Sequence, residues 1–206
     1  MEEILIFPYS GTAVEALDCL DGQWNCVGFI SDDVEVIGTK KFGIEIFGRD
    51  GFKKFRNARV LAVHGSPASF LQREDILLSL GVEPERFATV IHPKSSISKN
   101  AKIGRNVLIM AGVVVAANAI LGDHVVVLPN AVIHHDSHIE DLTLIGANVT
   151  IAGGVKVGRN SYIGAASSIK NGIQLGEKML VGMGANVVSS FSGRATIAGN
   201  PARVLS

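Results

Sequence analysis

The sequence predicts a small α/β domain followed by a parallel β-helix, and three observations support this prediction. Short apolar runs alternate with helix-like segments before about residue 93. Beyond that point, aliphatic residues recur at every sixth position. The 206 residues are 47% hydrophobic and include 23 glycines, a composition that suits a large buried core with many tight turns. We therefore expect one domain over residues 1–92 and a second over residues 93–206.

The N-terminal part has the pattern of a Rossmann-like βαβαβ unit. Strands are predicted at Ile4–Tyr9, Cys26–Ile30 and Arg59–Val63. A helix is predicted from Thr12, which opens a capping-box spacing, to Leu20, and another from Ser66-Pro67 to Leu80. Such a unit has a parallel sheet, and ligands bind at the carboxyl ends of its strands.

The C-terminal part follows a strict period of six. A small or apolar residue comes four positions after each stepped aliphatic, and Gly, Asn and Asp cluster between them. Three hexapeptides make one triangular coil of eighteen residues, with the stepped aliphatics inside and the Gly, Asn and Asp positions at its corners. The stepped residues are Ile97, Ile103, Ile109, Val115, Leu121, Val127, Ile133, Ile139, Ile145, Ile151, Val157, Ile163, Ile169, Leu175, Val181 and Val187.

Charge and cysteine content exclude several classes of protein. Nineteen Lys and Arg balance nineteen Asp and Glu, so we expect no binding of nucleic acid and no attraction to an anionic membrane. The acidic start and the lone pair Cys19 and Cys26 predict a cytoplasmic protein without a disulfide framework. The apolar stretch Val107–Leu121 is too short for a membrane span and is interrupted by Asn118.

Residues five positions after each stepped aliphatic are expected to point outward. An outward apolar band of this length predicts a subunit interface, and three prisms around a threefold axis would bury one band each. We therefore expect a homotrimer. The aliphatic residues at these positions in the first half of the repeat are Leu108, Val114, Ile120, Val126, Val132 and Leu144.

Three segments resemble one group of enzymes. The closing Gly199–Val204, the segment 132–136 around His135, and the segment 152–158 around Gly153 are similar to those of left-handed β-helix acyltransferases that use acetyl-coenzyme A. Within that family the chain looks like the bacterial nucleotide-sugar N-acetyltransferases acting on 4-amino-4,6-dideoxyhexoses, with sialic-acid O-acetyltransferase-like relatives. The resemblance covers nearly the whole chain and is strongest over residues 95–205.

The resemblance implies a reaction and an assembly. The acetyl group of acetyl-CoA would pass to the 4-amino group of a UDP- or dTDP-linked sugar, and O-acetylation of a sialic acid or a similar hydroxyl is the alternative. The N-terminal domain would hold the nucleotide, and coenzyme A would lie between adjacent β-helices of a trimer. Two features differ from many relatives. Leu144 stands where they have a second histidine, and the loop at residues 8–12 lacks their glycine-rich start.

His135 is the candidate general base, because an imidazole accepts a proton near neutral pH. Asp136 is expected to orient it, provided that the corner bends the chain, because adjacent residues on a straight strand point to opposite faces. Gly153 follows His135 by eighteen residues, one coil further, where its N–H is placed to hold the thioester oxygen. The alternatives without a catalytic role are that His135 is a surface histidine at a turn, that Asp136 only forms the turn, and that Gly153 is a corner glycine without a ligand.

The other predicted site residues belong to the two substrates. By resemblance, Ala165 and Met183 line the coenzyme groove. An acidic pair, Asp32 and Asp33, ends the second strand, where carboxylates accept hydrogen bonds from a ribose or a pyrimidine N–H. Two helix starts are weak candidates for binding the diphosphate, and the residues concerned are Ser10, Gly11, Thr12, His64 and Gly65.

Two further classes of function are alternatives for this sequence. Hexapeptide β-helices also resemble gamma-class carbonic anhydrases, in which histidines of neighbouring coils hold zinc. No two histidines of the repeat lie near eighteen residues apart, so we expect no metal site. A scaffold without catalytic activity is the remaining alternative, and the pair His134-His135 among small corner residues argues against it.

Overall fold

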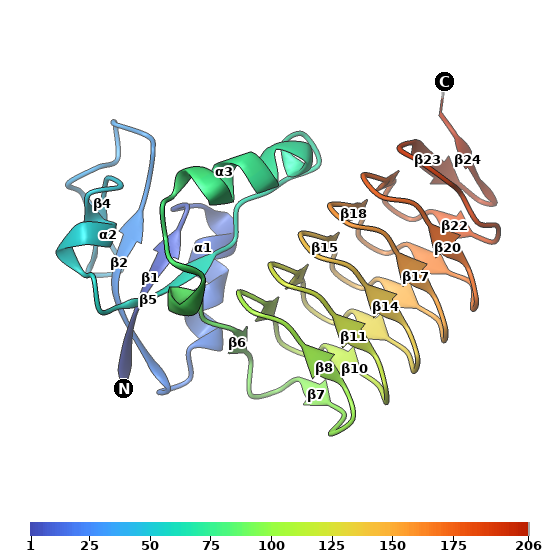
Figure 1. Ribbon diagram of the computed structural model, residues 1–206, viewed down its shortest axis with the longest axis horizontal. Helices are drawn as coiled ribbons and strands as arrows, with labels where there is room; N and C mark the ends of the chain where they lie inside the picture. The colour runs from blue at the N-terminus through green and yellow to red at the C-terminus, as the bar shows by residue number, and fades with distance from the viewer. Residues whose placement is uncertain (206) are drawn as a thin grey trace.

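The α/β domain lies against one side of a triangular β-helix in the computed structural model, which describes residues 1–205 (Figure 1). The chain passes once from the domain into the β-helix and then winds away from it, coil after coil, to the C-terminus. The predicted fold class is confirmed. The first strand of the β-helix, β6, pairs with β9 in the next coil.

The sheet of the N-terminal domain has five strands in the order β3-β4-β2-β1-β5. The pairs β1–β2, β1–β5 and β2–β4 are parallel, as a βαβ arrangement requires, and β3 runs antiparallel to β4. Strands β3 and β4 were not predicted from the sequence, because both are short and their lysines and glutamate obscure the apolar signal. The strands are β1 (Glu2–Phe7), β2 (Trp24–Ile30), β3 (Lys40–Lys41), β4 (Ile44–Phe47) and β5 (Arg59–Ala62).

The helices are shorter than predicted. The first begins at Gly11 rather than Thr12, because the side chain of Ser10 accepts a hydrogen bond from the Ala13 N–H at 3.3 Å and caps the helix. The predicted helix from Ser66 is wrong in its first part, where Ser69 Oγ binds the Ser66 N–H and competes with a helical turn. No helix within residues 1–205 is long and apolar enough to cross a bilayer. The helices are α1 (Gly11–Glu15), α2 (Gly51–Lys54) and α3 (Arg73–Ser79), with 3₁₀ turns η1 (Ala16–Cys19), η2 (Phe70–Gln72) and η3 (Pro84–Arg86).

The β-helix has three flat faces built from short strands, and from β6 to β22 paired strands are parallel and eighteen residues apart. At the C-terminal end, β23 pairs in parallel with β21, and β24 runs antiparallel to β23. The covered face consists of β6 (Val90–Ile91), β9 (Leu108–Ile109), β12 (Val126–Val127), β15 (Leu144–Ile145), β18 (Tyr162–Ile163), β21 (Leu180–Val181), β23 (Thr196–Gly199) and β24 (Ala202–Val204). The uncharged face consists of β7 (Ser96–Ile97), β10 (Val114–Val115), β13 (Val132–Ile133), β16 (Thr150–Ile151), β19 (Ser168–Ile169) and β22 (Asn186–Val187). The polar face consists of β8 (Lys102–Ile103), β11 (Ile120–Leu121), β14 (His138–Ile139), β17 (Lys156–Val157) and β20 (Gln174–Leu175).

The stepped aliphatics form the core of the β-helix, as predicted. Each is the second residue of one of the strands β7 to β22, and all are buried except Ile97 and Ile103 in the first coil, which are half-buried. Small residues four positions later, such as Ala119 and Ala131, are fully buried beside them. The period of six therefore fixes the register between coils.

The prediction of a single outward apolar band is wrong. A coil has three sides, so consecutive hexapeptides project their outward residues onto three different faces. Val114 and Val132 lie on the uncharged face, and Ile120 lies between Lys102 and His138 on the polar face. The remaining outward aliphatics lie on the covered face, where the N-terminal domain of the same chain buries them, with exposed fractions of 0%, 1% and 6% for Leu108, Val126 and Leu144.

Asn106 joins the two domains through hydrogen bonds. Its side-chain amide accepts from the Ala62 N–H at 2.8 Å and donates to the Ala62 carbonyl at 2.9 Å, which satisfies the open edge of β5. The same amide nitrogen lies 2.9 Å from His124 Nδ1. Because this nitrogen can only donate, His124 is neutral and carries its proton on Nε2.

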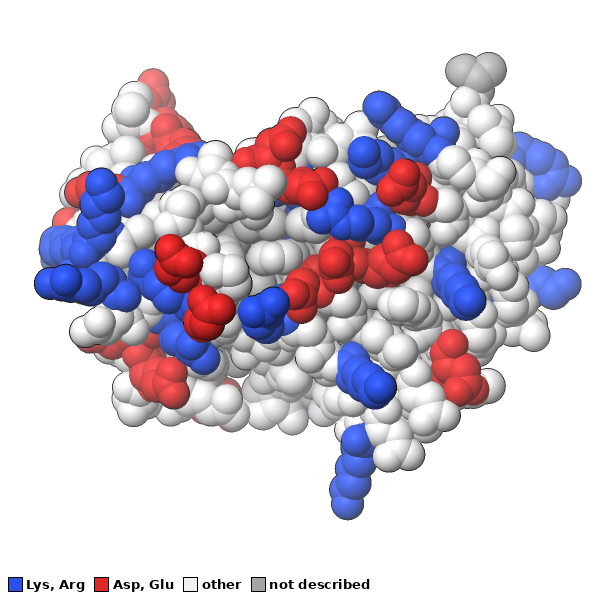
Figure 2. Space-filling model, viewed as in Figure 1, with Lys and Arg blue, Asp and Glu red and all other residues white. Residues whose placement is uncertain are grey.

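Arg73 is the second polar link between the domains. It is fully buried and donates to the carbonyls of Leu142 at 2.6 Å and His124 at 2.9 Å. Burial lowers its pKa to about 9, so the guanidinium stays charged at neutral pH. Figure 2 shows acidic and basic side chains interleaved over this junction, where Arg159 pairs with Glu74 at 2.7 Å.

Val126→Asp is expected to lower the free energy of unfolding by at least about 3 kcal/mol, because it places an unpaired carboxylate in the apolar contact between the domains. Chemical denaturation followed by circular dichroism measures the change. The matched control is Ile120→Asp, the equivalent strand position on the polar face, where a loss of only about 1 kcal/mol is expected. Equal losses in the two variants would contradict the assignment of the covered face.

His124 predicts how stability depends on pH. Burial, followed by the nearby Arg73 charge, lowers the pKa of His124, whereas Asp123 and Asp141 raise it and Arg105 lowers it. The unfolded chain therefore binds this proton at a higher pH than the folded chain, so stability is complete above about pH 6.5 and falls as the pH drops below it. His124→Asn keeps an acceptor for Asn106 and removes the titration. Denaturation at pH 7.5 and pH 5 should show a smaller acid loss in this variant, and an unchanged loss would refute the assignment.

Candidate functional site

His135 lies at the corner between β13 and β14, where the chain turns from the uncharged face to the polar face. Asp136 follows it with a left-handed φ of 58°, which an aspartate tolerates better than most residues. This bend turns the carboxylate back toward its neighbour. His135 Nδ1 lies 2.7 Å from Asp136 Oδ2, so the two side chains form a hydrogen-bonded dyad.

Asp136 has a second partner, which the sequence analysis missed. The Asn118 side-chain amide donates to Asp136 Oδ1 at 3.0 Å from one coil earlier. The hydrogen bonds from His135, first, and from Asn118 hold the pKa of Asp136 below its usual range. The carboxylate is therefore charged at neutral pH. The eighteen-residue spacing between Asn118 and Asp136 was the signal available in the sequence.

Gly153 lies directly beside the imidazole of His135. The strand register pairs Ile133 with Ile151, so Gly153 occupies the same corner one coil further. A Cβ on Gly153 would lie 2.8 Å from both Nε2 and Cε1 of His135, too close for any side chain at this position without movement of the ring. The missing side chain therefore leaves space for the imidazole beside Gly153, with the Cε1–Nε2 edge of the ring nearest to it.

A cavity of about 200 Å³ lies between the domains at the carboxyl ends of the sheet strands. It contains two residues of the predicted nucleotide site, Thr12 and Gly65, together with Ser66. The β-helix contributes apolar side chains to its wall, among them Leu144 and Tyr162, which the sequence analysis did not place there. A site between a sheet and its neighbouring domain is a common location for a small-molecule ligand.

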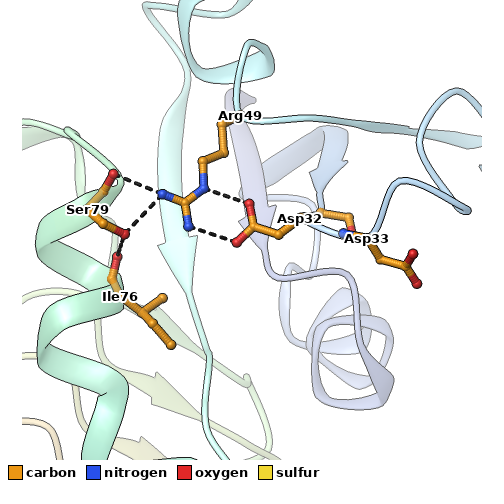
Figure 3. Close-up of polar contacts among 6 residues, drawn as sticks. Asp32, Asp33, Arg49, Ile76 and Ser79 are labelled. Carbon is orange, nitrogen blue, oxygen red and sulfur yellow. Dashed lines mark hydrogen bonds and ion pairs between the residues drawn. The ribbon is translucent and has the colours of Figure 1, made fainter.

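The predicted acidic pair is split (Figure 3). Arg49 binds both oxygens of Asp32, at 2.6 and 2.8 Å, and also donates to the Ser79 carbonyl at 2.9 Å. The hydrogen bonds from Arg49 lower the pKa of Asp32. Asp33 points away from this cluster, and its Oδ1 accepts from the Glu35 N–H at 3.0 Å. The pair therefore does not act as one unit in this structure.

The other predicted phosphate-binding residues have different surroundings. Ser10 caps α1, and Gly11 is exposed at its start. His64 is half-buried, its Nε2 atom is enclosed without a hydrogen-bond partner among residues 1–205, and burial lowers its pKa. The expected helix start after Gly65 is absent from the described chain, because a turn precedes η2 there.

Ala165 and Met183 lie on a different corner from His135. They follow β18 and β21, where the chain turns from the covered face to the uncharged face. Met183 is 77% exposed. Gly146, one coil before Ala165, lies against its backbone and also lines the cavity. The structure therefore brings the predicted coenzyme corner next to the cavity between the two domains.

The corner of His135 is opposite the covered face in the triangular section of the β-helix. In one chain, His135 and the N-terminal domain are therefore on opposite sides of the prism. Asp136 and Gly153 join His135, whereas Thr12, Gly65 and the Ala165 corner gather on the other side. Among residues 1–205, no three His, Cys, Asp or Glu side chains gather as ligands for a metal.

Residues 100–135 and 136–171 match the family described as bacterial transferase hexapeptide, with six repeats. No curated protein sequence matches the chain.

Solved structures match the chain over its length. The acetyltransferase domain of PglB from Neisseria gonorrhoeae, in complex with acetyl coenzyme A, has a TM-score of 0.86 and 24% identity, with 99% of each chain covered. GDP-perosamine N-acetyltransferase from Caulobacter crescentus, a histidine-to-alanine mutant in complex with CoA and GDP-perosamine, has a TM-score of 0.85 and 20% identity, covering 100% of this chain and 97% of that one. WeeI from Acinetobacter baumannii has a TM-score of 0.83 and 22% identity, with 100% of both chains covered. The chain therefore has the fold of these proteins from end to end, an α/β domain followed by a left-handed β-helix of hexapeptide repeats.

Proposed function

We propose that this protein is an N-acetyltransferase that moves the acetyl group of acetyl-CoA to the amino group of a nucleotide-linked aminosugar. The observation that carries the proposal is the dyad of His135 and Asp136, whose Nδ1 bond leaves Nε2 free beside Gly153. Asp136 fixes Nδ1 of His135, and Nε2 remains free beside a glycine that has no side chain. An imidazole held in this way suits proton removal from an incoming amine.

His135 Nε2 takes the proton from the amine as its nitrogen attacks the thioester carbonyl. Gly153 N–H has no acceptor among residues 1–205 and donates to the oxygen that gains negative charge. A carbon–nitrogen bond forms, the carbon–sulfur bond breaks, and the proton passes from His135 to the departing thiolate. Asp136 stabilises the imidazolium between these steps. The reaction needs neither a serine nor a cysteine nucleophile.

The solved relatives support this choice of substrates. The PglB domain was solved in complex with acetyl coenzyme A, and the Caulobacter enzyme in complex with CoA and GDP-perosamine, a nucleotide-linked aminosugar. We propose a 4-amino-4,6-dideoxyhexose linked to UDP or dTDP as the substrate of this chain, held by the cavity at Thr12 and Gly65. The remaining proposed contacts to it are Ser10, Gly11, Asp32, Asp33 and His64.

The proposed active unit is a homotrimer, because one chain holds the two halves of the site on opposite sides of its prism. The uncharged face lies between the corner of His135 and the corner of Ala165 and Met183. Its outward residues are free of charge, in contrast to those of the polar face, and they are Ser96, Val114, Val132, Thr150, Ser168 and Asn186. Packing this face around a threefold axis brings His135 of one copy to the coenzyme corner of the next.

Incubating the purified protein with acetyl-CoA and a panel of UDP-, dTDP- and GDP-linked aminosugars tests the activity. We expect thiol release and an N-acetylated product, detected by mass spectrometry, with at least one 4-amino sugar. Matched sugars carrying a 4-hydroxyl should not react. Transfer to hydroxyl sugars alone would replace the proposal with O-acetylation.

The control for this assay is His135→Ala. It should reduce kcat about 100-fold or more while the fold and coenzyme binding persist, because general-base catalysis contributes a factor of this size. Asp136→Asn should cost less, since the imidazole remains. A variant lacking His135 with nearly full turnover would exclude it as the base.

Val114→Asp tests the assembly. This side chain is 37% exposed in one chain, so a carboxylate there is tolerated by a monomer but not inside a threefold contact. We expect a folded monomer without activity, measured by light scattering at assay concentration. The control Ile120→Asp, on the polar face, should stay trimeric and active. A fully active monomer of the unaltered protein would refute the shared site.

A further inference from the structure

The geometry points to Asn118 as a positioning residue that holds Asp136 and, through it, the reactive tautomer of His135. This inference rests on the proposed function, because it concerns the base of that reaction. It extends the dyad to a chain of three side chains taken from two successive coils.

The three side chains are joined end to end. Asn118 Nδ2 lies 3.0 Å from Asp136 Oδ1, and Asp136 Oδ2 lies 2.7 Å from His135 Nδ1. Each oxygen of the Asp136 carboxylate therefore accepts a hydrogen bond from a different side chain. A carboxylate held at one oxygen alone rotates easily, because its terminal torsion has broad minima. The amide of Asn118 fixes this torsion and aims Oδ2 at the imidazole.

Asn118 is placed for this task by the coil register. Strands β10 and β13 pair in parallel, and the Asp136 N–H donates to the Ala117 carbonyl at 3.0 Å, so the two corners stack in contact. The neighbours of Asn118 at its corner, Ala116, Ala117 and Ala119, have no polar side chain. The amide of Asn118 is thus the side-chain donor that this corner offers to Asp136.

Asparagine also suits the backbone at this position. Its φ is 60°, a left-handed conformation that Asn and Asp adopt more readily than other residues with a Cβ. A corner of the β-helix requires only this backbone conformation. Asn148 has the same conformation, with a φ of 57°, at another corner of the prism. A role confined to the backbone and a role in orienting Asp136 can therefore be separated by substitution.

The dyad is exposed, which explains why a second donor matters. The side chains of His135 and Asp136 are 64% and 57% exposed, so water competes for both. With Asp136 fixed, the proton of a neutral His135 stays on Nδ1 and the lone pair stays on Nε2, beside Gly153. When the carboxylate turns away, the imidazole adopts the other tautomer, which presents a proton where the reaction needs a base.

The test uses Asn118→Asp, which keeps the left-handed corner but replaces the donor with an acceptor. Nitrogen-15 NMR of the imidazoles at alkaline pH, with His135→Ala to assign the signals, measures the tautomer of His135 whether or not a substrate is known. We expect the Nδ1–H form to decrease in Asn118→Asp. Asn148→Asp makes the same change at a corner without this contact and should leave the tautomer unchanged.

Kinetics provide the second readout. Asn118→Asp should lower kcat about tenfold, with KM changed less than about twofold, as expected for a group that supports the base without touching substrate. Asp136→Asn combined with Asn118→Asp exchanges carboxylate and amide, so position 136 again offers an oxygen to His135 and a donor to position 118. This double variant should turn over faster than either single variant, which a purely structural role does not produce.

The outcomes separate this inference from the proposed function. An unchanged tautomer in Asn118→Asp, or losses that simply add in the double variant, overturns the role of Asn118. A shifted tautomer in a protein that transfers no acetyl group to any aminosugar supports the positioning role and refutes the proposed function instead.

Discussion

The stacking of aliphatic side chains inside the β-helix is the constraint on which the rest of this protein depends. Each stepped residue must point inward, and a slip of one residue would expose the whole set, so the register between coils is fixed. Residues eighteen apart therefore become neighbours. The contacts of His135 with Gly153, of Asn118 with Asp136 and of Arg105 with Asp123 all follow from this one rule.

The second organising contact is the burial of one face by the N-terminal domain. Apolar side chains such as Leu108 and Val126 supply its area, and the polar groups at its edge are satisfied by Asn106 and Arg73. Both residues bind main-chain groups across the junction, so they set the orientation of the domains as well as their contact. Covering this face leaves the corner of His135 on the far side, free to meet another molecule.

The side chains of the His135–Asp136 dyad are largely exposed to solvent. An exposed imidazole and carboxylate gain modest energy from their contact, because water screens it. Their orientation therefore comes from geometry, namely the left-handed bend at Asp136 and the stacked coils on either side. A neighbouring subunit that covers this corner would exclude water and strengthen the same hydrogen bonds.

The sequence by itself determined the two-part fold, the inward residues and the strands β1, β2 and β5, because periods of two and six in hydrophobicity report directly on which side chains are buried. It also indicated that Gly153 lies beside His135, since the coil length follows from the repeat. Only the tertiary structure decided which face is covered, because the same outward aliphatics suit a subunit contact and a domain contact equally well. It also decided the pairing of Asp32 with Arg49, the cavity at Thr12 and the place of Leu144 in its wall. These depend on contacts between segments far apart in the chain, for which local pattern carries no signal.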